Sequence, residues 1–191
     1  MNVRGGATRA QIVDAADRLF YRQGYERTSF AAIAQAVQIS RGNFYHHFKS
    51  KDLILEAVIE ARLGDTRRML EQWETEQPEP GDRIRRFVEI LLTNRADIQS
   101  YGCPVGALTS ELAKRDHAAL AEANGLFTLF RTWLGDQFTL LGHADEADAL
   151  AMHLLAVSQG VATLANAFKD EDFIRREVRR INDWLGTYTT T

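Results

Sequence analysis

Hydrophobic residues recur along nearly the whole chain at intervals of three and four, the spacing of an amphipathic helix. Ile12, Ala15, Ala16 and Leu19 share one helical face, and Gly24 follows where a left-handed C-terminal cap is expected. Serine and threonine caps and a loop at 77–81 complete the pattern, which predicts nine helices: about 8–23, 29–37, 40–47, 51–76, 82–98, 104–115, 117–141, 145–168 and 171–188. We therefore expect an all-α fold.

Two short helices joined by a tight turn lie near the N-terminus, and Ser40 caps the second. This arrangement is typical of a helix-turn-helix, whose second helix enters the major groove of DNA. Phe44 and Phe48 repeat four residues apart and are expected to face inward. The opposite face then presents four polar or aromatic side chains: Arg41, Asn43, Tyr45 and His46.

The residue types on that face suit DNA. Arginine can bond guanine through two donors, asparagine can do the same with adenine, and Gly42 has no side chain to keep the backbone away. Tyr45 and Lys51 suit phosphate contacts, as do the backbone N–H groups near Thr28, Ser40 and Lys51. Packing against neighbouring helices is the alternative role for Tyr45 and His47.

Charge is divided unevenly along the chain. Residues 1–51 carry eight basic and three acidic residues, so their net charge is +5, whereas the whole chain carries −3 and the remainder therefore −8. We call the basic residues 1–51 the head and the acidic remainder the body. This division of charge fits a protein that touches a polyanion at one end, although chance clustering would also produce it. A protein that packages DNA regardless of sequence would instead need basic charge over the body. We place a DNA-binding domain at 1–53 and a second domain at 54–191.

Several other classes lack support in the sequence. We find no Gly-x-Ser-x-Gly, no phosphate-binding glycine loop and no metal-ligand spacing, so we expect neither an enzyme nor a cofactor or metal site. One cysteine excludes an internal disulfide. The uncharged run 149–168 is long enough to span a bilayer, but its polar residues and alanines favour a buried helix over a membrane partner. The N-terminus lacks the apolar run of a secretory signal, so a cytoplasmic location is expected.

Two segments carry a resemblance to a known family. Residues 28–34 read TSFAAIA and residues 39–53 read ISRGNFYHHFKSKDL, which together resemble the N-terminal signature of TetR/AcrR-family regulators. The resemblance covers about residues 8–55, and it departs at Gln38, where the family often has glycine in the turn. It implies a dimeric repressor that reads a palindromic DNA operator and releases it when a small molecule binds. It also implies that Thr28, Tyr45, His47 and Lys51 contact phosphate, while Arg41, Gly42, Asn43 and His46 face bases.

The dimer that the resemblance implies has a candidate interface near the C-terminus. Two helical stripes step by threes and fours, as helices of a four-helix bundle between two subunits would, with small residues between them that permit close approach. The alternative is that both stripes serve only the core of one subunit. The stripes comprise Leu150, Leu154, Val157, Val161, Leu164 and Phe168 in the first, and Ile174, Val178, Ile181 and Leu185 in the second.

The body offers apolar surface for an effector. Large apolar side chains with few charges among them favour an apolar or aromatic molecule, although plain core packing is the alternative for each residue. This set is Met69, Trp73, Phe87, Leu91, Leu108, Phe127, Phe130, Trp133 and Met152, to which we add Cys103. Because Cys103 is expected at the N-terminus of a helix, where the dipole favours thiolate, a redox-responsive regulator is an alternative function; a buried, inert cysteine is the simpler reading.

Overall fold

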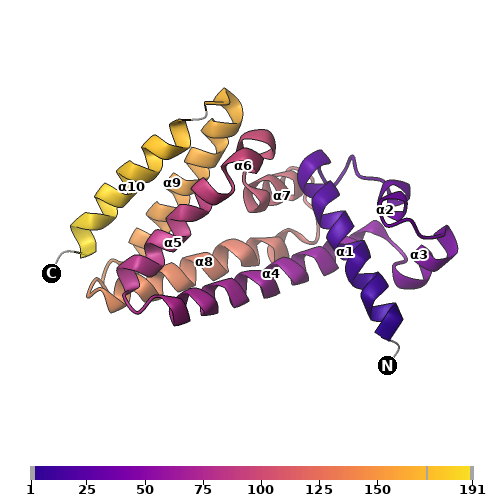
Figure 1. The fold of residues 1–191 in the computed structure, drawn as a ribbon, viewed down its shortest axis with the longest axis horizontal. Coiled ribbons are helices and arrows are strands. Elements are labelled where there is room, and N and C mark those ends of the chain that lie inside the picture. Colours follow the sequence, from indigo (N-terminus) through magenta and orange to yellow (C-terminus); the bar gives the residue numbers. More distant parts are fainter. Residues whose placement is uncertain (1–2, 171, 190–191) are drawn as a thin grey trace. The chain divides into compact units, whose positions relative to one another are not determined.

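The structure is a computed structural model that describes residues 3–170 and 172–189 (Figure 1). The regular elements of these residues are all helices, which confirms the predicted all-α class. Ten helices are present in the described part: α1 (Val3–Gln23), α2 (Phe30–Ala36), α3 (Arg41–His47), α4 (Lys51–Glu76), α5 (Pro80–Thr93), α6 (Arg95–Tyr101), α7 (Pro104–Ala113), α8 (Leu120–Leu140), α9 (Ala147–Phe168) and α10 (Phe173–Thr189).

The tenth helix arises because the segment predicted as one helix over 82–98 is two. Asn94 lies between α5 and α6 with φ −99° and ψ 15°, and serves as the C-cap of the first and the N-cap of the second. Asparagine is a weak helix former because its side chain competes for backbone hydrogen bonds. The turn between α2 and α3 has Gln38 at φ 55°, a left-handed conformation that glycine would adopt at lower cost.

The chain folds as two compact units. The first consists of Met1–Asp65 with Ala107–Asn124, and the second of Thr66–Gly106 with Gly125–Thr191. The unit that holds the helix-turn-helix is thus larger than residues 1–53, because it also includes α4 as far as residue 65, α7 from residue 107 and α8 as far as residue 124. The functional boundary at residue 53 remains a prediction.

The first unit has its own hydrophobic core. Phe44 and Phe48 from α3 pack there with Ile33 of α2, as their spacing predicts. Leu112 from α7 is fully buried in the same cluster. The core therefore joins the DNA-binding motif to a segment more than fifty residues further along the chain.

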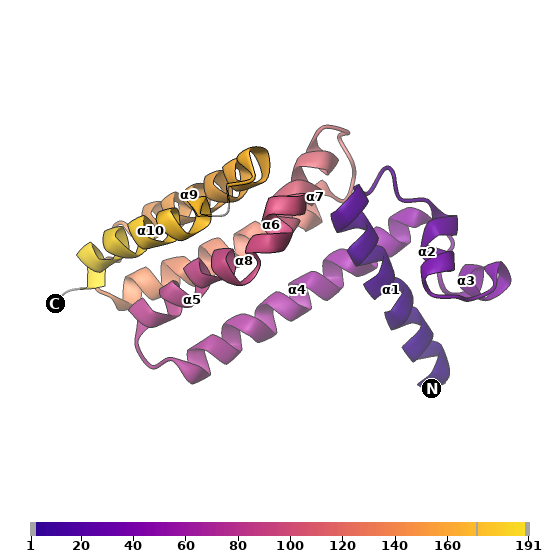
Figure 2. The ribbon, with the colours of Figure 1, turned by 45° about the horizontal axis from the view of Figure 1, so that its top comes forward.

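The second unit is built around α9 and α10, which lie side by side in both ribbon views (Figures 1 and 2). α10 packs on α5 and α9, and α6 packs on α9. By length and composition α9 could cross a membrane, with a mean hydropathy of 1.2 over its best window, but 44% of that window is buried within the protein. The buried residues of α9, among them Leu154, Val161 and Ala165, belong to the core of the second unit.

Candidate DNA-binding surface

Short polar caps fix where the helices of the candidate site begin. The hydroxyl of Ser29 accepts a hydrogen bond from the N–H of Ala32 at 3.0 Å, which starts α2. Ser40 accepts from the N–H of Asn43 at 3.3 Å and starts α3. A cap of this kind contributes about 1 kcal/mol and satisfies an otherwise unpaired N–H group.

Two phenylalanines hold α3 from behind. Phe44 is 1% exposed and meets Phe30 edge-on, with ring centroids 4.6 Å apart. Phe48 is 2% exposed, and the guanidinium of Arg9 lies 4.7 Å from its ring centroid. With one side of α3 fixed in this way, the other side remains on the surface.

The surface side of α3 carries most of the residues predicted to meet DNA. Gly42, Asn43, Tyr45 and His46 are exposed and His47 is half-buried, while the side chain of Arg41 lies outside the described residues. A Cβ added to Gly42 would meet nothing within 4 Å, so packing within the chain does not require glycine there. The base and phosphate contacts of these residues stay predictions.

Thr28 does not lie where a phosphate-binding side chain is expected. Its side chain is fully buried, and its hydroxyl donates to the carbonyl of Gly24 at 2.8 Å. The side chain therefore has its partner inside the protein, and its predicted phosphate contact gains no support from this arrangement. The hydroxyl stabilises the turn before α2 instead.

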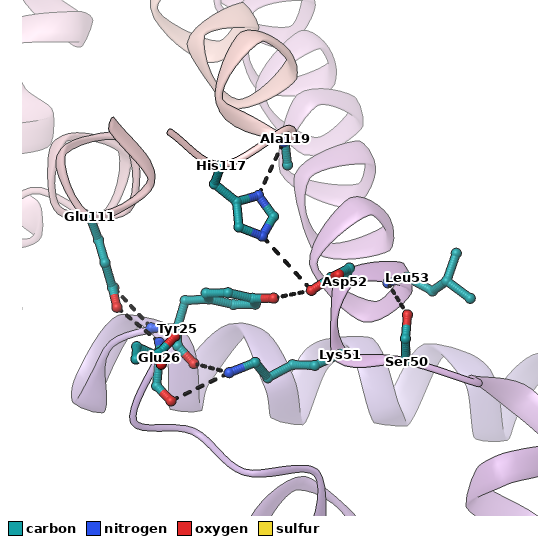
Figure 3. A network of polar contacts seen from close by, with 9 residues as sticks. All are labelled: Tyr25, Glu26, Ser50, Lys51, Asp52, Leu53, Glu111, His117 and Ala119. Carbon is teal, nitrogen blue, oxygen red and sulfur yellow. Dashed lines mark hydrogen bonds and ion pairs between the residues drawn. The ribbon is translucent and has the colours of Figure 1, made fainter. Parts of the chain in front are cut away.

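The side chain of Lys51 also has partners within the protein (Figure 3). Its ammonium donates to the carbonyls of Tyr25 and Glu26, at 3.1 and 3.3 Å, and lies 4.2 Å from the ring centroid of Tyr25. These contacts direct the charge towards the turn between α1 and α2. Two of its three donors therefore already have partners, and the phosphate contact expected of Lys51 stays a prediction.

Tyr25 is the centre of a polar network that sequence reasoning missed. Its hydroxyl donates to the carboxylate of Asp52 at the start of α4. Burial, together with this hydrogen bond and the charge of Asp52, raises the pKa of Tyr25 above its ordinary value. The partners in the network come from residues 25–26, 51–52 and 111–119, and no pattern within one short segment signals contacts between them.

The predicted effector set divides into several environments. In the second unit, Trp73 and Trp133 pack with ring centroids 5.8 Å apart, and Phe87 and Phe130 with centroids 5.3 Å apart. The remaining members there are buried or partly buried in the same core: Met69, Leu91, Cys103 and Phe127.

Two members of that set lie elsewhere. Leu108 is buried in the core of the first unit. Met152 is 44% exposed on the outer face of α9 and does not line an interior. Helical periodicity marks a residue as apolar but does not specify which neighbour covers it, so the structure separates these two from the rest of the set, whose effector role stays a prediction.

The predicted dimer stripes are mostly interior. Seven of their ten members are buried within one subunit: Leu150, Leu154, Val161, Ile174, Val178, Ile181 and Leu185. Val157 is half-buried, and only Leu164 and Phe168 are exposed, at 44% and 75%. All seven lie in the core of the second unit, which fits the alternative of packing within one subunit; the four on α10 are covered by α5 and α9.

Comparison with known proteins identifies the family. A sequence model of the N-terminal domain of the bacterial regulatory proteins of the tetR family matches residues 12–58. A model of the C-terminal domain of LmrA/YxaF-like transcriptional regulators matches residues 80–179, just over half of the chain. This chain belongs to the TetR family. It is a transcriptional regulator with a DNA-binding helix-turn-helix, and its relatives are regulators rather than enzymes.

Individual relatives of this TetR-family chain match it over stretches of very different length. TtgR of Pseudomonas putida is 43% identical over 54 residues, which is 28% of this chain and 26% of that regulator, so the likeness spans about a quarter of each. An HTH-type regulator in the lacX 3′ region of Lactococcus lactis is 26% identical over 167 residues, 85% of both proteins.

Solved TetR-family structures share the whole fold. A regulator from Legionella pneumophila has a TM-score of 0.80 at 24% identity, covering 91% of this chain and 94% of its own. One from Streptomyces coelicolor has a TM-score of 0.82 at 19% identity and covers 97% of each chain. At these identities the likeness supports the fold alone.

Proposed function

We propose that this TetR-family regulator is a cytoplasmic repressor that binds a palindromic operator as a homodimer through α3 and releases it when a small apolar or aromatic molecule binds the body. The observation that carries the proposal is the exposed side of α3, which presents Asn43 and Tyr45 while Phe44 and Phe48 are buried behind it. A short helix fixed in this way can enter the major groove without rearranging its own core.

The outer face of α9 supports the dimer. Met152, Leu164 and Phe168 expose large apolar surface along it, and Ala156 and Gly160 between them are exposed and small. Large exposed apolar side chains gathered on one helix favour an interaction site there. A second copy is the partner we propose, because TetR-family regulators typically act as dimers.

Release of DNA follows from a shift between two states of the dimer. The effector must bind more tightly to the state that does not fit the operator than to the state that does, since equal affinity for both states would shift nothing. Helix α4 runs without a break from Lys51 to Glu76 and so offers one continuous element between the head and the body. We propose that a change in its tilt alters the distance between the two recognition helices.

The test is binding of the purified protein to labelled duplexes that tile the DNA upstream of its own gene. We expect one palindromic fragment to bind two chains with a dissociation constant of about 10⁻⁸ to 10⁻¹¹ M, with half-sites about 34–36 Å apart. A panel of aromatic compounds should contain some that release it. Uniformly weak binding to every fragment, including random duplexes, would contradict the proposal.

A redox-responsive regulator is a second candidate, favoured by one contact. The sulfur of Cys103 accepts a hydrogen bond from the N–H of Gly106 at 3.5 Å, in the first turn of α7. The contact places the sulfur at the first turn of a helix, and Cys103 is partly exposed there. If Cys103 is the sensor, hypochlorite or a quinone should release DNA from the wild type but not from Cys103→Ser.

A further inference from the structure

The turn between α1 and α2, residues 24–26, is hydrogen-bonded on two sides to charged side chains that are distant in sequence. On one side the carboxylate of Glu111 on α7 accepts hydrogen bonds from the N–H groups of Tyr25 and Glu26, both at 2.9 Å. On the other side the ammonium of Lys51 donates to the carbonyls of the same two residues. Two neighbouring residues of the turn therefore connect an acid on α7 to a base on α4 (Figure 3).

The side chain of Tyr25 meets α4 and the loop between α7 and α8. The ring of Tyr25 lies edge-on to the ring of His117, with centroids 5.3 Å apart, while its hydroxyl reaches Asp52. Because Nδ1 of His117 accepts the N–H of Ala119, the neutral ring carries its proton on Nε2, which lies 3.8 Å from Asp52 Oδ1.

An ion pair adds a second side chain from the loop between α7 and α8. Arg115 pairs with Glu26 at 3.1 Å. We use the name turn clamp for the five side chains that surround residues 24–26: Lys51, Asp52, Glu111, Arg115 and His117.

The backbone of the turn is matched to the clamp. Gly24 has φ 88°, and a Cβ added there would lie 3.1 Å from one carboxylate oxygen of Glu111 and 3.3 Å from the other. A side chain at this position would meet both a strained backbone conformation and the incoming carboxylate. The glycine thus allows α7 to approach the turn closely.

The chain continues from this turn directly into the DNA-binding motif. The carbonyl of Gly24 accepts the hydroxyl of Thr28, and Ser29 next to it caps α2. On the other side, Lys51 and Asp52 form the first turn of α4. Order in residues 24–26 therefore orders the beginnings of both α2 and α4.

We propose that the turn clamp is the connection through which α7 sets the DNA-binding competence of the head. Residues 107–124 fall within the part of the chain that matches the C-terminal family domain, yet they pack in the compact unit of the helix-turn-helix. Withdrawal of α7 leaves the N–H groups of Tyr25 and Glu26 without their acceptor and frees Tyr25 from His117. The turn then loosens, and DNA binding must order it again. This inference rests on the proposed function and names the contact by which the head is regulated.

The test compares Glu111→Gln with Glu122→Gln, a charge-matched control on the same segment, whose carboxylate is exposed at the start of α8. We expect Glu111→Gln to speed hydrogen exchange of the Tyr25 and Glu26 amides about tenfold, because a neutral amide replaces a charged acceptor. Affinity for the operator duplex found by tiling should fall about fivefold relative to the control, with both proteins fully folded at the assay temperature.

A second measurement needs no variant. Coupling between two sites is reciprocal, so DNA bound to the wild type should slow exchange of the Tyr25 and Glu26 amides and of the amides of α7. A purely structural contact would lower thermal stability in Glu111→Gln without changing the affinity of the folded protein.

The outcomes separate the two proposals. If the wild type binds the operator and Glu111→Gln binds as tightly as Glu122→Gln, or if DNA leaves exchange in α7 unchanged, the clamp proposal is overturned while the proposed function stands. If the wild type binds no duplex, the proposed function fails, and the clamp proposal falls with it.

Discussion

Replacing Lys51 with methionine separates two roles for this residue. Methionine keeps an unbranched apolar stem of similar length and removes the ammonium. In the structure that ammonium contacts the carbonyls of Tyr25 and Glu26 and the ring of Tyr25, whereas the family resemblance implies a contact with DNA phosphate. The first role predicts a loss of protein stability, and the second predicts a loss of salt-dependent DNA affinity.

The structural role sets the size of the effect. A hydrogen bond from a charged donor contributes about 1.5–3 kcal/mol and an exposed cation–π contact about 0.5–1 kcal/mol. Lys51 is only half-buried and the freed carbonyls can bind water, so we expect a total loss of about 2 kcal/mol rather than the full sum. For a chain of this length, that corresponds to a fall in melting temperature of about 4–8 °C.

The assay pairs urea or thermal unfolding with titration of the operator duplex at several salt concentrations. Lys49→Met is the matched control, because Lys49 is exposed two residues away and its replacement changes the charge equally. We expect Lys51→Met to be less stable than the control and to keep the wild-type salt dependence. Unchanged stability with a salt slope smaller by about 0.9, the value for one phosphate contact, would refute this reasoning.

Three further predictions follow from burial and charge. Phe44→Ala should lower the free energy of unfolding by about 3–5 kcal/mol in urea titration, because a fully buried ring is removed from behind α3. Leu164→Glu should convert the dimer to a monomer, as measured by light scattering. Leu140→Glu, a change at an exposed leucine on α8, should leave the protein dimeric. The same oligomeric state in both variants would contradict the proposed interface. The pKa of Tyr25 is raised in the folded state, so folding favours the neutral phenol. The stability that this group contributes is present below about pH 10 and is lost as the pH rises further. Between about pH 9 and 11 the free energy of unfolding should therefore fall less for Tyr25→Phe than for the wild type.

The local elements were predictable from sequence because their signals are local. Ser40 and the pair Phe44 and Phe48 predict both the start of α3 and the side that is buried, and the structure confirms both. The break at Asn94 was missed, since one asparagine within an apolar pattern only weakly favours an interruption.

The partners of each apolar face were not predictable in the same way. The stripe of α10 that ends at Leu185 has the spacing of a core helix and of a bundle interface alike, and only its packing on α5 and α9 decides between them. The bonds from Glu111 to residues 25 and 26 span 86 and 85 positions, and a single sequence carries no signal for such a contact. Family resemblance, for its part, gave Lys51 a role without showing that its ammonium already has partners.

The claim that most of the account depends on is that the exposed side of α3 reads bases. It is tested most directly by measuring the affinity of Asn43→Ala for the operator duplex, for the operator with each base pair changed in turn, and for random DNA. We predict that affinity for the operator falls by about 1–3 kcal/mol, that preference is lost at one base pair of each half-site, and that affinity for random DNA is unchanged. Equal loss of affinity on operator and random DNA, with the base preferences intact, would contradict it.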